Sequence, residues 1–321
     1  MIDIFFLTPC FKERVWGSQK LSQAFNYSLP TGKIGECWGI STHKNGETYI
    51  KDGPFSDLTL EVLWRQEPQL FDHPRFSRFP LLIKILDANE SLAVQVHPDD
   101  DFALLHEDDL GKTECWYIID AQPDAEIILG HKATTTDELA QMIDLKQWEK
   151  LLNYVPVKNG DFFYIPSGTI HALGKGILVL ETQQNSDTTY RIYDFDRLHK
   201  NGEKIPLDLA KSLAVTTVPD PFKETVYHED KQASHSLTTF VDNAFFKVQK
   251  WEIDGYLGFT KEEPYLLCSV ISGSGTITLL ENQSTRSLRL GDHFIIPATV
   301  TSWSLNGKLT LIVSSPGSLY Q

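Results

Sequence analysis

The sequence lacks several features that mark particular classes of protein. Among its 321 residues there are only four cysteines, Cys10, Cys37, Cys115 and Cys268, and no two of them form a C-x-x-C pair. This spacing excludes the usual zinc-ribbon and thiol-redox motifs. We therefore expect four reduced, partly buried thiols.

Positive charge is also scarce. Lys and Arg number 29 against 43 Asp and Glu, which gives a formal net charge of -14. Nucleic acids and anionic membranes are bound by basic surfaces, so we expect neither as a partner. A small anionic ligand is compatible with this composition, because it needs only a few local Lys or Arg side chains.

Long hydrophobic runs are absent as well. No segment approaches the roughly 20 apolar residues of a transmembrane helix. The first six residues, MIDIFF, contain an acid where a signal peptide needs basic residues, and their apolar run is short. We expect a cytoplasmic protein that is a monomer or a weak homodimer.

Most of the chain has the pattern of short β-strands. Apolar or alternating runs lie between Gly, Pro, Asn and Asp turns at 35–41, 79–86, 91–96, 114–119, 125–129, 161–165, 178–183 and 189–193. Such runs predict antiparallel sandwiches or barrels, and therefore a mainly β fold. Helical patterns occur at 58–70, 136–144, 145–152 and 208–213, which we expect to be additions to the β scaffold.

A weak internal repeat refines this prediction. The segment Gly160–Pro166 (GDFFYIP) matches Gly291–Pro297 (GDHFIIP). A turn, an alternating strand and a second turn of this kind form a unit of jelly rolls, so the repeat predicts two of them. We place a catalytic domain at 1–217, a linker at 218–236 and a second domain at 237–321.

Metal-capable side chains are concentrated in the first copy. Gln95 and His97 stand two residues apart, and in a strand that spacing directs both side chains to one face. Pro98 ends the strand. Glu114 opens a later apolar run, where a carboxylate alone is more often a solvated edge residue. His171 opens the strand after a Pro-Ser-Gly turn, where a lone His is more often structural.

Taken together, these residues favour a metal site. Gln-x-His, then Glu, then His is the ligand order of cupin-type jelly rolls. The predicted ligands are Gln95, His97, Glu114 and His171. Zinc accepts two imidazoles, a carboxylate and an amide oxygen. Two His and a carboxylate also describe a non-haem iron centre, so the ligand types leave zinc, iron, manganese and cobalt open.

The second copy has no such ligand set. Ser302 stands at the position that corresponds to His171, and His293 takes the place of Phe162 without an evident partner. We therefore expect the second jelly roll to pack or dimerise and to carry no chemistry.

Two cations accompany the predicted ligands. Lys112 lies two residues before Glu114 and shares its face in a strand. This pair is either a plain ion pair or a substrate-binding cation beside a metal ligand. Arg191 follows the polar segment 185–188, which has the composition of a surface loop, and is flanked by aromatic residues. An Arg held among aromatics often binds an anionic group.

The motifs resemble those of type I mannose-6-phosphate isomerases of the short bacterial form. The resemblance covers most of residues 1–315 and rests on the segments Gln95–Asp99 (QVHPD), Lys112–Glu114 (KTE), Pro166–Ala172 (PSGTIHA) and Asn185–Arg191 (NSDTTYR). It implies a zinc-dependent aldose–ketose isomerase that interconverts mannose 6-phosphate and fructose 6-phosphate. It implies one zinc ion on the predicted ligands and places the usual active-site group on Arg191.

One departure from the family pattern bears on substrate binding. The family often has Ser two residues before the Gln, and this chain has Ala93 there. Lys112 is therefore our first candidate for contact with the phosphate or the ring oxygen, and Lys84 is the second.

We expect Arg191 and Lys112 to act as catalytic cations, because isomerisation through an enediol(ate) develops negative charge on two oxygens. The proton-transferring base is open among a zinc-bound water, Asp99 and His106.

Two other functions fit part of this pattern. An iron-dependent cupin dioxygenase would use His97, Glu114 and His171. It would not need Gln95, Lys112 or the segment 185–191. A non-catalytic sugar-phosphate-binding protein would bind its ligand without turnover, but has no need for an open metal site.

Overall fold

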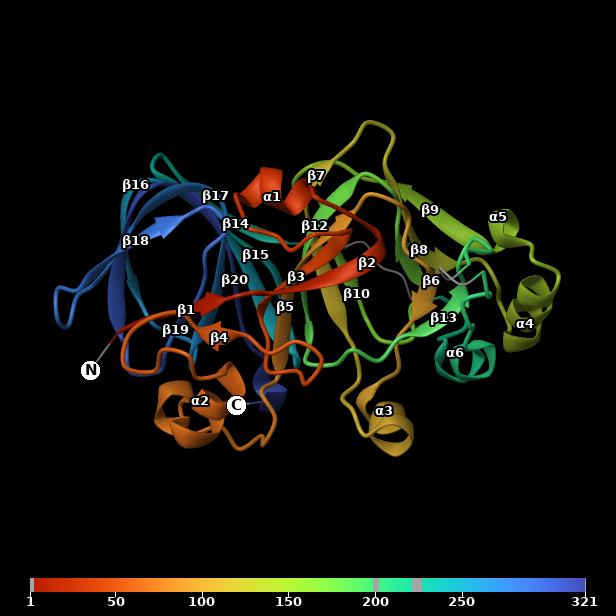
Figure 1. Cartoon of the computed structure of the whole chain (residues 1–321), viewed down its shortest axis with the longest axis horizontal. Coiled ribbons are helices and arrows are strands. Elements are labelled where there is room, and N and C mark those ends of the chain that lie inside the picture. The colour runs from red at the N-terminus through yellow and green to blue at the C-terminus, as the bar shows by residue number, and fades with distance from the viewer. Residues whose placement is uncertain (1–2, 199–201, 221–226, 321) are drawn as a thin grey trace. The chain divides into compact units, whose positions relative to one another are not determined.

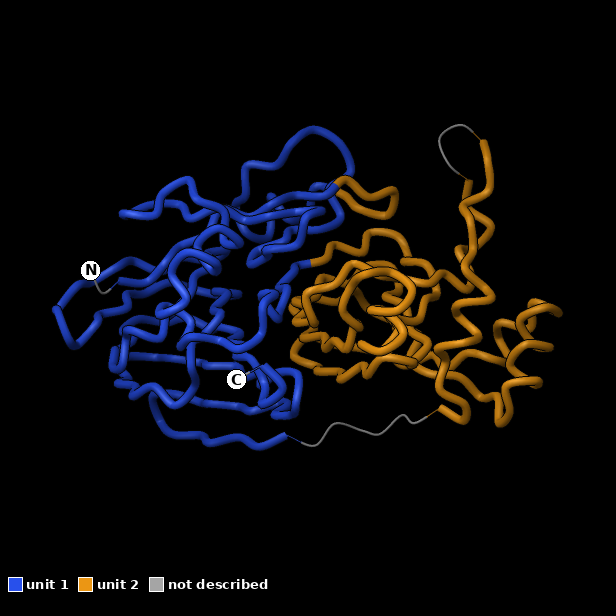
Figure 2. The backbone as a smooth tube through the Cα atoms, turned by 90° about the horizontal axis from the view of Figure 1, so that it is seen from below, with its two compact units in different colours: residues 1–12, 19–85, 225–321 blue, residues 13–18, 86–224 orange. Residues whose placement is uncertain are grey.

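The computed structural model describes residues 3–198, 202–220 and 227–320 (Figure 1). This part of the chain is mainly β, as predicted, and forms two compact units (Figure 2). Unit 1 comprises residues 1–12, 19–85 and 225–321, and unit 2 comprises residues 13–18 and 86–224. The chain passes between the units within β2 (Cys10–Ser18) and within β5 (Leu81–Ala88).

Unit 1 is built on an antiparallel sheet with the strand order β14-β15-β16-β20-β17-β19-β1-β4, and β18 pairs with β17. The bounds of these strands are β1 (Phe5–Thr8), β4 (Tyr49–Ile50), β14 (His228–Gln232), β15 (His235–Asp242), β16 (Phe246–Thr260), β17 (Leu266–Leu279), β18 (Thr285–Arg289), β19 (His293–Ile296) and β20 (Ser302–Pro316). The unit also contains β3 (Ile34–Ile40), α1 (Lys20–Phe25), α2 (Leu60–Gln66) and the 3-10 helices η1 (Pro68–Phe71) and η2 (Ser318–Tyr320).

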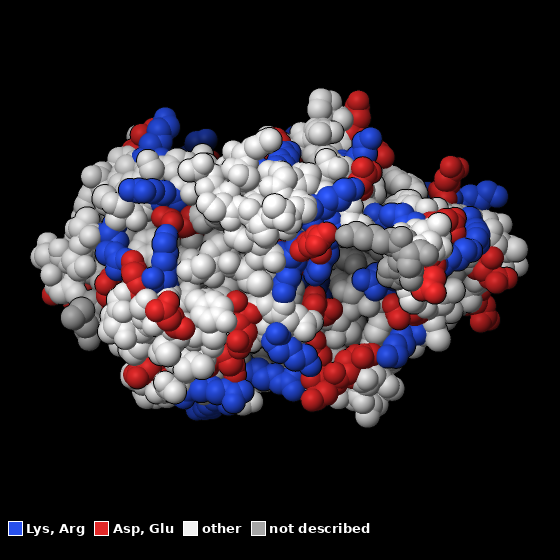
Figure 3. All heavy atoms as spheres, in the orientation of Figure 1, with Lys and Arg blue, Asp and Glu red and all other residues white. Residues whose placement is uncertain are grey.

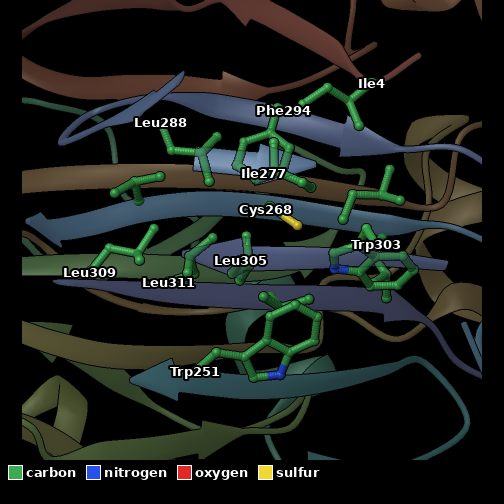
Figure 4. Packing of buried hydrophobic residues seen from close by; sticks show 14 of the residues in the cluster. Ile4, Trp251, Cys268, Ile277, Leu288, Phe294, Trp303, Leu305, Leu309 and Leu311 are labelled. Atoms are coloured by element: carbon green, nitrogen blue, oxygen red, sulfur yellow. The ribbon is translucent and has the colours of Figure 1, made fainter. Parts of the chain in front are cut away.

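The core of unit 1 follows from alternation along these strands. On β20, residues 303, 305, 309, 311 and 313 are buried in one cluster, together with Trp251, Cys268 and Phe294 from neighbouring strands (Figure 4). Burial of each large apolar side chain stabilises the fold by about 1.5–3 kcal/mol. The interior of this unit is therefore filled by side chains.

Unit 2 contains the sheet β13-β6-β11-β8-β9 and the strand run β10-β7-β12. The strands are β6 (Val94–Val96), β7 (Glu114–Ala121), β8 (Glu126–His131), β9 (Leu152–Pro156), β10 (Phe162–Ile165), β11 (His171–Leu173), β12 (Ile177–Gln184) and β13 (Tyr190–Tyr193). The helices are α3 (Asp100–Glu107), α4 (Thr136–Asp144), α5 (Trp148–Leu151) and α6 (Leu209–Val215).

Two hydrophobic clusters cover opposite faces of the sheet that contains β6 and β11. Val94, Val96 and Ala172 face a cluster that includes Leu139 and Leu151 from α4 and α5. Leu173 points to the opposite face of the sheet, into a second cluster that also contains side chains of β7 and β12. Because side chains alternate along a strand, Gln95 and His171 point to the same face of the sheet as Leu173, toward this second cluster.

The helices differ in detail from the predicted ones. The predicted helix at 58–70 is α2, which begins after the N-cap Thr59, followed by η1 from Pro68. The helix at 136–144 matches α4, and the predicted helix at 145–152 is the shorter α5. The predicted helix at 208–213 corresponds to α6, which begins at Leu209. The helices α1 and α3 were not predicted.

The predicted domain boundaries at 217 and 237 stay a prediction. Within the predicted linker, residues 221–226 lie outside the described part of the chain, and β14 falls in its second half. No helix among the described residues is long and apolar enough to cross a membrane. On the face shown in Figure 3, Lys and Arg side chains are interspersed with Asp and Glu.

The expectation that His293 has no partner is wrong. The ring is buried, its Nδ1 lies 2.8 Å from Ser269 Oγ, and its Nε2 lies 3.0 Å from the Tyr27 hydroxyl. Burial lowers the pKa of His293 to about 4, so the ring is neutral at pH 7. The residue is a hydrogen-bonded part of the unit 1 core.

Gly39 on β3 borders this ring, and we predict that Gly39→Ala destabilises the protein by about 1–3 kcal/mol. A Cβ at Gly39 would lie 2.4 Å from His293 Cε1, and the ring is fixed by hydrogen bonds at both nitrogens. Denaturant unfolding measures the effect. Gly258→Ala is the matched control, since a Cβ there would meet only the Tyr256 hydroxyl at 4.0 Å. Equal unfolding midpoints for the two variants would contradict the prediction.

Candidate metal centre

Four of the predicted site residues lie on four different strands of unit 2. His171 opens β11 and pairs directly with Gln95 on β6. On the other side of β6, Gln95 pairs with Arg191 of β13. Directly paired residues of antiparallel strands share a face, so these three side chains lie on the same side of the sheet. Glu114 is the first residue of β7, a strand whose side chains belong to the same hydrophobic cluster as Leu173 of β11.

Three predicted ligands converge in the structure. The ligand atoms of His97, Glu114 and His171 all lie within 4.8 Å of one another, and all three residues are buried. His171 Nε2 lies 3.3 Å from Glu114 Oε1, and His97 Nε2 lies 3.5 Å from Glu114 Oε2. Residues up to 74 positions apart therefore form one cluster of the size that a metal ion occupies.

Backbone carbonyls orient both imidazoles. His97 Nδ1 lies 2.9 Å from the Thr188 carbonyl, and His171 Nδ1 lies 2.9 Å from the Thr169 carbonyl. A carbonyl oxygen only accepts hydrogen bonds, so each Nδ1 is the donor. Burial lowers the pKa of His97 well below its usual value, so this ring is neutral and its Nε2 carries a lone pair, as in imidazoles that bind metal ions.

Glu114 supports the same interpretation. Its Oε1 is buried and has no hydrogen-bond partner among the described residues. Burial would raise the pKa of this carboxyl, but the adjacent Lys112 ammonium opposes burial, and the pKa lies well below its usual value. A buried anionic oxygen without a partner is costly, and a cation between the carboxylate and the two imidazoles would satisfy it. The donor set thus fits a metal ion.

Gln95 lies beside this cluster. Its amide nitrogen is 3.3 Å from His171 Nε2. The nitrogen and oxygen of an amide exchange places when the group turns by half a rotation. Gln95 can therefore present an oxygen at the same position, as a fourth ligand requires.

Lys112 is buried against the predicted ligands. Its ammonium contacts the Glu114 carboxylate and lies 3.0 Å from His97 Nε2 and 3.8 Å from Glu181 Oε1. Burial would lower the pKa of Lys112, but the Glu114 and Glu181 carboxylates outweigh it and raise the pKa. Lys112 is therefore a fixed cation next to the site.

Glu181 is a site residue that the sequence analysis missed. It is buried on β12, directly opposite Trp116 of β7, and its carboxylate accepts a hydrogen bond of 2.8 Å from Trp116 Nε1. The sequence contained a signal, since Glu181 is an acid within the otherwise apolar run ILVLE. A buried acid in such a run needs a charged or polar partner.

Arg191 is exposed on β13. Its backbone N–H donates to the Asp208 carboxylate at 3.1 Å, while its guanidinium makes no hydrogen bond or ion pair with any described residue. The side chain is therefore available to a ligand on the face of the sheet that also carries Gln95 and His171.

The remaining candidates occupy other positions. Asp99 is the N-cap of α3, where its carboxylate accepts from Phe102 N–H at 2.9 Å, and the exposed His106 packs on the Phe102 ring. No hydrogen bond or ion pair described for either residue joins it to the metal ligands. Lys84 belongs to unit 1, where its buried ammonium lies 4.6 Å from the Trp38 ring centroid. Their functional roles stay predictions.

Comparison with known proteins identifies the family. The family model described as phosphomannose isomerase type I, catalytic domain, matches residues 4–113, and the one described as mannose-6-phosphate isomerase, cupin domain, matches residues 236–316. The chain is 48% identical, over 97% of its length and 98% of the relative's, to a Bacillus subtilis protein named probable mannose-6-phosphate isomerase GmuF. The chain belongs to the type I phosphomannose isomerase family.

Further comparisons agree with this membership. The mannose-6-phosphate isomerase of Streptococcus mutans is 47% identical over 98% of each chain. A crystal structure of the mannose 6-phosphate isomerase from Bacillus subtilis superimposes with a TM-score of 0.94 at 46% identity, covering 97% of this chain and 99% of that one. The predicted family and the predicted cupin-type jelly-roll fold are thereby confirmed.

Proposed function

We propose that this chain is a zinc-dependent isomerase that interconverts mannose 6-phosphate and fructose 6-phosphate through an enediol(ate). The observation that supports this most directly is the buried His97–Glu114–His171 cluster, whose carboxylate has an unpartnered oxygen. The relatives from Bacillus subtilis and Streptococcus mutans are named as mannose-6-phosphate isomerases, and these names supply the substrate.

The residues that would hold the zinc ion are Gln95, His97, Glu114 and His171. When bound, zinc would supply a Lewis acid that polarises the sugar oxygens at C1 and C2. The chain's own task is to hold its ligands rigid, and the two Nδ1 hydrogen bonds to backbone carbonyls support that task.

Lys112 would act as a cation and hydrogen-bond donor. Its raised pKa keeps the ammonium protonated at neutral pH, so it is not suited to accept the proton from C2. Glu114 and Glu181 already balance its charge. Lys112 would therefore contact a sugar oxygen rather than the phosphate.

Arg191 would stabilise the negative charge of the transition state. Removal of the C2 proton converts the C1 carbonyl and the C2 hydroxyl into an enediol(ate), and its protonation at C1 gives the ketose. A planar guanidinium can donate two parallel hydrogen bonds to the two enediol(ate) oxygens. The side chain of Arg191 is exposed, and its guanidinium has no partner among the described residues, which supports this role.

A coupled assay tests the proposal and separates the alternatives. We expect zinc-loaded protein to convert mannose 6-phosphate into fructose 6-phosphate with no oxygen uptake. Oxygen consumption by the iron-loaded protein, without isomer formation, would instead favour a dioxygenase. Saturable binding of the sugar phosphate without any product would favour a binding protein.

A further inference from the structure

We propose that Asp109 is a positioning residue for the metal centre, acting on His97 through the loop 185–188. The inference rests on the proposed function, because it assumes that His97 binds a metal ion. Asp109 lies just after α3, outside every segment that the sequence analysis selected.

The Asp109 carboxylate accepts hydrogen bonds from several donors in this loop. Its Oδ2 accepts hydrogen bonds from Ser186 Oγ at 2.9 Å and from Thr188 Oγ1 at 3.0 Å, and the Asp187 N–H lies 3.4 Å away. Its Oδ1 accepts from the Leu110 N–H at 2.9 Å. One carboxylate thus ties together the loop's two hydroxyl groups.

Thr188 is fixed on both its side chain and its backbone. Its hydroxyl donates to Asp109, and its N–H donates to Ser186 Oγ at 3.2 Å. Gln183 in turn donates to the Ser186 carbonyl at 2.5 Å. The prediction of a surface loop at 185–188 is wrong for Asn185 and Ser186, which are both buried.

The held loop presents the Thr188 carbonyl to the metal ligand. His97 Nδ1 donates to this carbonyl at 2.9 Å, which directs Nε2 toward Glu114. Asp109, Thr188 and His97 thus form a continuous path of two hydrogen bonds. If the loop relaxes, the imidazole loses the contact that sets its tautomer and orientation.

A carboxylate is the group that this position requires. Asn has the same shape, but its amide directs N–H groups at one of the two sites where Oδ1 and Oδ2 now accept. In one orientation the amide N–H groups would face the Leu110 N–H, and in the other they would face the two hydroxyl groups, which would then have to rotate away. We therefore expect Asp109→Asn to loosen the loop without creating a cavity.

The test is the affinity of the metal-free protein for Zn²⁺, measured by competition with a chromophoric chelator. Loss of a group that orients a metal-ligating His costs about 10–100-fold in metal affinity. We expect losses of this order for Asp109→Asn. Thr188→Val removes the hydroxyl but keeps the carbonyl, so it should lower the affinity in the same direction. Asp101→Asn, an exposed position in the first turn of α3, should leave it unchanged.

Two additional readouts separate positioning from a general loss of stability. Excess Zn²⁺ should restore isomerase activity to Asp109→Asn, and thermal unfolding of the metal-free variants should show a cooperative folded state. Wild-type affinity in either folded variant would overturn the inference. If Asp109→Asn does not fold, Thr188→Val decides. If the wild-type protein itself binds no Zn²⁺, both the inference and the metal centre of the proposed function fail.

Discussion

Replacing His171 by alanine is expected to lower kcat/KM for mannose 6-phosphate by about 10³-fold or more. A metal Lewis acid contributes several kcal/mol to transition-state stabilisation, and each 1.36 kcal/mol is a factor of about ten in rate. His171 is fully buried between Gln95 and Glu114, and the substitution removes one of the two proposed imidazole ligands.

The loss should appear first in the metal content. We expect purified His171→Ala to hold much less zinc than the wild type, as measured by elemental analysis, while its far-UV circular dichroism stays native. His228→Ala, an exposed position on β14, is the matched control and should keep both zinc and activity. A His171→Ala protein that retains stoichiometric zinc and wild-type turnover would contradict the assignment.

Arg191→Ala is expected to lower kcat by about 10²–10³-fold with little change in KM, the effect typical of removing one donor that stabilises a transition-state oxyanion. The fold should tolerate the change, because the side chain is exposed and its guanidinium contacts no described residue. Steady-state kinetics on mannose 6-phosphate measures the effect.

Two companion variants sharpen this prediction. Arg191→Lys keeps the charge but not the planar pair of donors, so it should recover only part of kcat. Arg65→Ala, on an exposed helical position paired with Glu61, removes a remote guanidinium and should have no effect. An Arg191→Ala variant with raised KM and unchanged kcat would make Arg191 a substrate anchor.

The His97–Glu114–His171 cluster could be predicted because its signal is local. Gln95 and His97 stand two residues apart, with Gln95 on β6 and His97 directly after its end at Val96. The residues that contact the cluster from neighbouring strands could not be predicted from local spacing. Glu181 reaches Lys112 only because β12 pairs with β7 in a register that sets Glu181 opposite Trp116.

The missed features depend on tertiary contacts or weak patterns. His293 obtains its partners from Tyr27 and Ser269, which lie 266 and 24 residues away. The helix α3 has a clear cap in Asp99, but Ala103 is its one buried residue among those described, so the apolar period that predicts a helix is missing.

The central claim is that the His97–Glu114–His171 cluster holds the metal ion on which isomerisation depends, and a titration tests it most directly. Chelator-treated protein is titrated with Zn²⁺ while conversion of mannose 6-phosphate to fructose 6-phosphate is followed. We predict negligible activity without metal and a linear rise to a plateau at one equivalent of zinc per chain. Full activity in the metal-free protein, or added zinc without any gain in activity, would contradict the claim.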